Sequence, residues 1–169
     1  MSDEIQQRVR RDIAETGWHL VMVPPEQGTP GWTHTIGLAE RYDHPEIVIF
    51  GPDLEQIGPL ANHLGALVRG GRRLEAGTEA ADILQGHRMA FRAVAPKWVP
   101  VFLGNAAWHY ASEDVRVIQA FWPDPGGWFP WEEGADATWA DDQPRLESAH
   151  TLDALSESMI DVLRREGAL

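Results

Sequence analysis

Two carboxylates and two histidines in this sequence could take part in acid–base chemistry. Asp124 and Glu132 lie in the segment FWPDPGGWFPWEEG, whereas His44 and His109 lie elsewhere in the chain. A carboxylate packed beside tryptophan is expected to be partly desolvated, which raises its pKa toward values useful for general acid or base catalysis. No spacing pairs the four groups with one another. One alternative for the function is therefore a hydrolase-like enzyme that uses Asp124 with Glu132 or a histidine.

Sequence patterns for metal, nucleophilic and phosphate chemistry are missing. The seven histidines form no H-x-H, H-x-x-H or HExxH pair, and the chain has no cysteine, G-x-S-x-G elbow or phosphate-binding glycine loop. We therefore expect no bound metal and no cofactor. His44 and Glu46 are two residues apart and could act together. Pro45 between them instead favours a turn, in which His44 stabilises the turn and Glu46 caps a helix or pairs with another group.

The segment FWPDPGGWFPWEEG, residues 121–134, is called the aromatic loop below. Its three prolines and three glycines exclude a regular helix or a central strand. Pro123 should end a strand, residues 125–127 should form a tight turn, and Asp124 should accept N–H bonds from that turn. The loop is expected to cover one end of a sheet as a hydrophobic lid with Trp131 largely buried, or to form the wall of a ligand pocket. The ligand-binding candidates within it are Trp122, Asp124, Trp128 and Trp131.

Five segments make the chain similar to the bacterial family catalogued as domain of unknown function 4262. They are GWHLVMV, WTHTIGL, HPEIVIFG, VIQAFWPDPGGWFPWE and QPRL, and they place the family-like region at about residues 5–146. The resemblance implies no particular activity, but its matching positions add Thr35 and Gln119 to the candidate ligand-binding residues. His34 stands where tyrosine is common in the family, which weakens a catalytic role for it.

Periodicity predicts an alternation of helices and strands along a single domain of residues 1–169. Expected strands cover residues 18–23, 32–38, 46–51, 87–94 and 115–122, and helices cover residues 2–16, 53–68, a stretch after Pro100, and about 151–166. Ser2, Asp53 and Thr151 are the expected N-caps, and Pro59 could instead mark the start of the second helix. The segment from residue 72 to 86 is polar and weakly patterned. These elements predict an α+β fold: one mixed, mostly antiparallel sheet with helices packed on it and the aromatic loop over one end.

Composition restricts the possible partners. The net charge is −12 and the chain has a single lysine, so we expect no binding to nucleic acid and none to an anionic membrane. No apolar run is long enough to span a bilayer and the first residues do not resemble a secretory signal, which favours a cytoplasmic protein. The leading interpretation is a domain that binds a small molecule or a protein partner through the aromatic loop. A third alternative is an acidic interaction or immunity-type protein that meets a basic partner.

Overall fold

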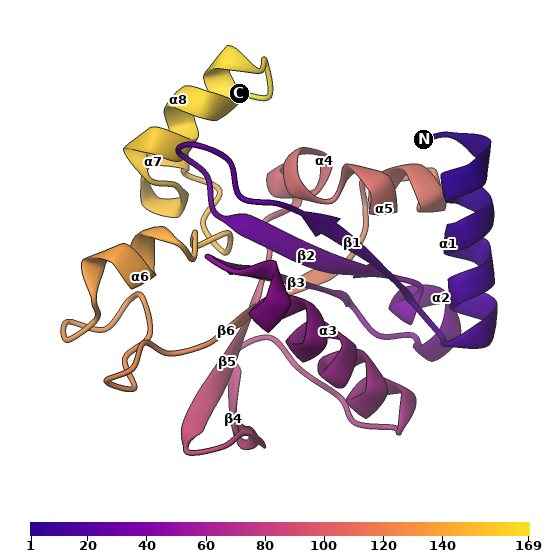
Figure 1. The fold of residues 1–169 in the computed structure, drawn as a ribbon, viewed down its shortest axis with the longest axis horizontal. Helices are drawn as coiled ribbons and strands as arrows, with labels where there is room; N and C mark the ends of the chain where they lie inside the picture. Colours follow the sequence, from indigo (N-terminus) through magenta and orange to yellow (C-terminus); the bar gives the residue numbers. More distant parts are fainter.

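The computed structural model describes all 169 residues and contains one six-stranded sheet with helices on both faces (Figure 1). The strands are β1 (His19–Val23), β2 (Gly31–Ile36), β3 (Glu46–Gly51), β4 (Thr78–Leu84), β5 (His87–Ala93) and β6 (Val117–Phe121). Their order across the sheet is β1-β2-β3-β6-β5-β4. Only β3 and β6 are parallel neighbours, and the other four pairs are antiparallel. The predicted α+β class is confirmed.

Eight α-helices and one short 3-10 helix complete the chain. They are α1 (Asp3–Glu15), α2 (Leu38–Tyr42), α3 (Leu54–Arg69), the 3-10 helix (Pro96–Trp98), α4 (Val99–Phe102), α5 (Gly104–Tyr110), α6 (Ala137–Asp141), α7 (Thr151–Ala154) and α8 (Glu157–Arg165). Ser2 and Asp53 cap α1 and α3 as predicted, through side-chain bonds to the N–H groups of Ile5 and Glu55. None of the helices combines the length and the apolar character that crossing a bilayer requires.

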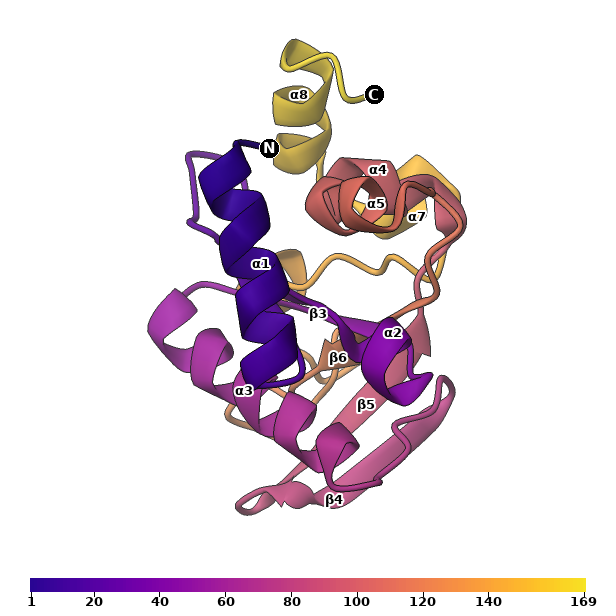
Figure 2. The same ribbon diagram turned by 90° about the vertical axis from the view of Figure 1, so that its right-hand side faces the viewer.

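Strand β3 shows how the sheet divides the hydrophobic core into two layers. Because side chains alternate along a strand, Ile47 and Ile49 face the layer of α3, whereas Val48 and Phe50 face the layer of α1, α4, α5, α7 and α8. Figure 2 shows α3 and the pair α4 and α5 on opposite sides of the strands. A continuous apolar run is the pattern expected of a strand buried on both faces.

Several local predictions were wrong, each for a physical reason. The weakly patterned segment contains β4, an edge strand whose alanines and acidic residues carry little apolar signal. The closing helix is interrupted at Leu155, so Ser156 caps α8 while Thr151 begins α7 without capping it, and Leu152 is 70% exposed instead of buried. Helix α3 starts at Leu54 after the predicted Asp53 cap and passes through Pro59, so only the alternative start at Pro59 is wrong. The short helices α2 and α6 were not predicted.

Candidate functional site

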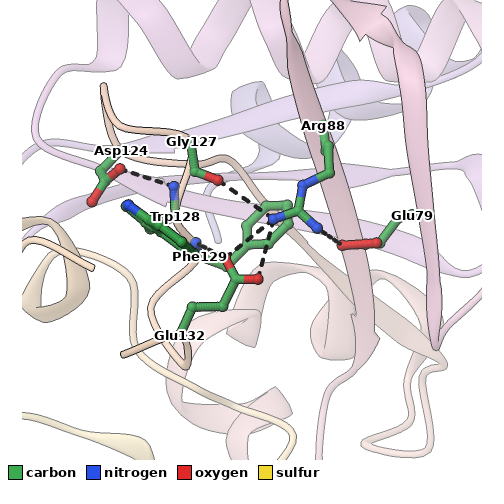
Figure 3. Close-up of polar contacts among 7 residues, drawn as sticks. All are labelled: Glu79, Arg88, Asp124, Gly127, Trp128, Phe129 and Glu132. Carbon is green, nitrogen blue, oxygen red and sulfur yellow. Dashed lines mark hydrogen bonds and ion pairs between the residues drawn. The ribbon is translucent and has the colours of Figure 1, made fainter. Parts of the chain in front are cut away.

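Asp124 organises the turn of the aromatic loop. Its carboxylate accepts the N–H of Trp128 at 2.9 Å (Figure 3). It also accepts the N–H of Asp136 at 2.8 Å, and the N–H of Gly127 donates to the Asp124 carbonyl at 2.8 Å. Gly127 has φ of 86°, which a glycine adopts readily. The hydrogen bonds from Asp136 and Trp128 hold the pKa of Asp124 below its ordinary value. The predicted turn and its acceptor are therefore present, but the predicted rise in pKa is wrong because N–H donors outweigh desolvation.

Arg88 of β5 links the aromatic loop to the β4–β5 hairpin. Its guanidinium donates to Glu79 at 2.9 Å and to both carboxylate oxygens of Glu132 at 3.1 Å, and it lies 4.7 Å from the centre of the Phe129 ring (Figure 3). Glu132 also accepts the N–H of Phe129 at 2.8 Å. That N–H bond, followed by the contact with Arg88, lowers the pKa of Glu132. Glu132 is thus a carboxylate with fixed partners.

The aromatic rings of the loop stack above the outer face of β5. Phe129 is fully buried, and its ring lies parallel to that of Trp131 with 5.0 Å between centroids. Arg92 closes the stack, with its guanidinium carbon 3.6 Å from the centre of the Trp131 ring. Arg88 and Arg92 share one face of β5 with Ala90 between them, and this small side chain is packed with Phe129 in one apolar cluster.

Trp131 forms one wall of a groove of about 540 Å³ on the β4–β5 hairpin. We call it the Trp131 groove; its other walls include Thr78, Arg92, Ala93 and Glu147. Oε1 of Glu147 accepts a hydrogen bond from Arg92 at 2.9 Å and two more from Arg145, whereas Oε2 is buried without a partner. Arg92 makes a single side-chain hydrogen bond and keeps further N–H donors for another group.

The predicted ligand-binding residues do not converge. Trp131 is partly buried and lines the groove, whereas Trp128 is 45% exposed and packs against Gly134. Trp122 points away from the groove: it packs against the core cluster on the α3 side of the sheet, and its indole N–H donates to the carbonyl of Phe50. The fully buried anchor of the loop is Phe129, not Trp131 as expected.

Thr35 and Gln119 belong to buried structural networks. Gln119 donates to the carbonyl of Pro144 at 2.6 Å and accepts the N–H of Leu146 at 3.2 Å, which fixes the segment that follows α6. Thr35 donates to Glu46 at 2.6 Å and accepts the N–H of Ile47 at 2.9 Å. The backbone pairing of β2 with β3 ends at His34 and Val48. The hydroxyl of Thr35 therefore accepts the N–H of Ile47 in place of a backbone carbonyl.

Glu46 is the most completely bonded buried acid in the molecule. Besides Thr35, the N–H groups of Gly37 and Ala39 and the hydroxyl of Tyr110 donate to its carboxyl at 2.7–3.0 Å. Burial raises the pKa of Glu46, and these hydrogen bonds act in the opposite direction. Burial, together with Glu46 itself, also raises the pKa of Tyr110. Glu46 caps the start of α2, as the turn interpretation of DHPE anticipated.

The two candidate histidines lie apart from the aromatic loop and have partners of their own. His44 is buried, and its Nε2 accepts the N–H of Leu74 at 3.0 Å. Burial lowers the pKa of His44. His109 of α5 contacts Glu40 of α2 at 2.6 Å. No three His, Asp or Glu side chains in the chain are grouped so that they could hold a metal ion.

Sequence reasoning missed the arginines and Glu147 at the groove. Arg88 and Arg92 are four residues apart in a predicted strand, so they were certain to share a face of the sheet. The partner elements could not be known, since Arg88 meets Glu132 across 44 residues and Arg92 meets Glu147 across 55.

A family model described as domain of unknown function (DUF4262) matches residues 12–136. No curated protein and no solved structure matches the chain. The matched range contains the strands, α3 and the aromatic loop, and it ends before Arg145 and Glu147.

Proposed function

We propose that this chain, which belongs to the family described as domain of unknown function (DUF4262), binds a small molecule in the Trp131 groove. The observation that carries the proposal is the pairing of a partly buried tryptophan with a stacked arginine at the wall of a groove of about 540 Å³. Small-molecule sites commonly have volumes of roughly 300–1,000 Å³, with aromatic walls and a few polar groups.

The polar groups of the groove favour a ligand with both acceptors and donors. Arg92 in the groove donates to Glu147, which Arg145 also contacts, and Glu79 adds a second carboxylate to the lining, so the groove offers both positive and negative charge. A ligand oxygen can accept the free N–H groups of Arg92 while an apolar part of the ligand contacts the part of Trp131 that lines the groove. A ligand donor that reached Oε2 of Glu147 would satisfy a buried acceptor that otherwise lacks a partner.

The geometry gives less support to acid–base catalysis by the aromatic loop. A general acid or base must exchange protons near the working pH. Asp124 and Glu132 both have lowered pKa values and accept hydrogen bonds from fixed backbone N–H groups. His44 and His109 are held by Leu74 and Glu40 at other places in the fold.

Native mass spectrometry of the protein purified from its own host tests the proposal. We expect a retained small molecule in the wild-type protein, and we expect its loss from Trp131→Ala and from Thr78→Trp, which fills the groove from β4. Trp128→Ala is the matched control, since it removes a tryptophan of the same loop that does not line the groove. Retention by all three variants, or a wild-type protein that carries no ligand, would contradict binding at this groove.

A further inference from the structure

A second hollow lies between the β1–β2 turn and α8, away from the Trp131 groove. Its volume is about 210 Å³, and its apolar walls include Val23, Trp32, Phe102 and Leu163. Figure 1 shows the β1–β2 turn reaching across to α7 and α8. We call this hollow the Trp32 pocket. None of its lining residues lines the Trp131 groove.

The aromatic wall of the Trp32 pocket is rigid. The indole N–H of Trp32 donates to the carbonyl of Phe102 at 2.9 Å, and the two rings meet edge to face with 5.4 Å between centroids. Phe50 stacks on Trp32 from the core at 5.7 Å. Tryptophan offers the strongest π surface for an organic cation, and a fixed ring loses no freedom on binding.

Two carboxylates without cationic partners stand beside this aromatic wall. Glu26 of the β1–β2 turn and Glu166 after α8 both line the pocket, and neither forms an ion pair with any Lys, Arg or His of the chain. The pocket continues into a wider hollow of about 520 Å³, which shares Glu26 and Glu166 and adds Asp161 and Arg165. Three carboxylates therefore face one arginine, and the whole cleft favours positive charge.

The turn that carries Glu26 is held in place before any ligand arrives. Glu26 and Thr29 exchange backbone hydrogen bonds of 3.2 and 2.9 Å. Gly28 has φ of 92°, and a Cβ added there would lie 3.1 Å from Cγ2 of Val162. Three prolines restrict the chain on either side of the turn, at positions 24, 25 and 30. A rigid turn packed on α8 keeps Glu26 beside the aromatic wall.

We propose that the Trp32 pocket binds a small organic ammonium ion. The aromatic wall of Trp32 and Phe102 receives the alkylated cationic group, and Glu26 and Glu166 balance its charge. The small volume selects a compact head group, because drug-sized ligands need roughly 300 Å³ or more. Two carboxylates beside hydrocarbon and indole surface suit an alkylammonium ion better than a metal ion, which needs several oxygen ligands.

Isothermal titration calorimetry with choline, paired with its uncharged isostere that has a tert-butyl group in place of trimethylammonium, tests this site. We expect saturable choline binding and at least about tenfold weaker binding of the isostere, the scale of a desolvated cation–π contact. Glu26→Gln and Glu166→Gln should each weaken choline binding by about three- to tenfold, since each removes one balancing charge.

Glu157→Gln is the matched control, because it removes an exposed carboxylate of α8 that does not line the pocket. It should leave the affinity for choline unchanged. Choline should also shift the methyl NMR signals of Val162 and Leu163, and urea melts should show that the variants remain folded. The proposal is overturned by absence of choline binding, by equal binding of the isostere, by an equal effect of Glu157→Gln, or by methyl shifts confined to other regions.

Discussion

Several polar residues in the segments that resemble the family bond to backbone groups and thereby hold neighbouring segments of the chain together. Thr35, Glu46, Gln119 and Asp124 each bond backbone N–H or carbonyl groups that no helix or strand satisfies. A buried backbone group without a partner costs about as much as a lost hydrogen bond, so these side chains have a structural reason to be polar. Polarity and burial alone therefore do not identify catalytic residues here. The groups that keep unused hydrogen-bonding capacity, Arg92 and Glu147, are better guides to function.

His34 should make the stability of the protein depend on pH. It lies buried on β2, and burial, with a smaller contribution from nearby His19, lowers its pKa from 6.5 to about 4. The unfolded state therefore binds more protons than the native state between these values, and stability falls as the pH drops from about 6.5 to about 4. His34 should contribute about 3 kcal/mol to this change, measured as the difference between urea melts of the wild type and of His34→Gln.

His34→Gln separates this effect from the titration of the acidic residues, because only the contribution of His34 disappears. The variant should lose less stability than the wild type over the same pH range. Glu46 acts with the opposite sign: its raised pKa favours the native state at acid pH, and that contribution is lost as the pH rises above the ordinary value for glutamate. Parallel stability profiles for the wild type and His34→Gln would contradict the assignment to His34.

At the scale of elements, the sequence correctly predicted the strands and turns that depend on interactions between residues close together in the chain. The strands β1, β2, β3, β5 and β6 follow from apolar patterning, and the turn of the aromatic loop follows from Pro125, Gly126 and Gly127. The parallel pairing of β3 with β6 could not be predicted, because it joins segments about 70 residues apart through tertiary packing. The stacking of Arg92 of β5 on Trp131 of the aromatic loop could not be predicted for the same reason, because it also depends on tertiary packing.

The aromatic loop should depend on Phe129 for its attachment to the sheet. Phe129 is fully buried with Ala90 and Phe121, whereas Trp128 of the same loop is 45% exposed. Phe129→Ala should lower the free energy of unfolding by about 3–5 kcal/mol, the usual cost of removing a buried aromatic ring. Trp128→Ala should cost less than about 1 kcal/mol, as most surface substitutions do. Urea melts of the two variants, which each remove one ring from one loop, measure the difference; equal costs would mean that the loop is not anchored through Phe129.

At the scale of the whole molecule, the segment beyond the family match completes the core. Of the 18 buried residues in the larger hydrophobic cluster, six lie after residue 136: Leu146, Ala154, Leu155, Met159, Ile160 and Leu163. The same segment supplies the backbone groups that Gln119 bonds and the side chain of Gln143, which bonds both backbone groups of Trp122. The matched residues 12–136 thus depend on the last part of the chain for one face of their sheet.

A chain shortened to residues 1–136 should therefore lose its fixed tertiary structure. Removal of six core side chains exposes Val48, Phe50 and Trp98 of the same cluster, and it leaves the buried side chain of Gln119 without either of its partners. Together, these two losses cost more free energy than the typical stability of a domain, which is about 5–15 kcal/mol. We expect strong secondary-structure circular dichroism, weak near-ultraviolet circular dichroism and a broad urea transition. A chain that ends after Arg165 and lacks only the last four residues is the matched control and should melt as cooperatively as the wild type, because those residues are exposed. A sharp transition of the 1–136 chain near the wild-type midpoint would show that the family-matched region folds by itself.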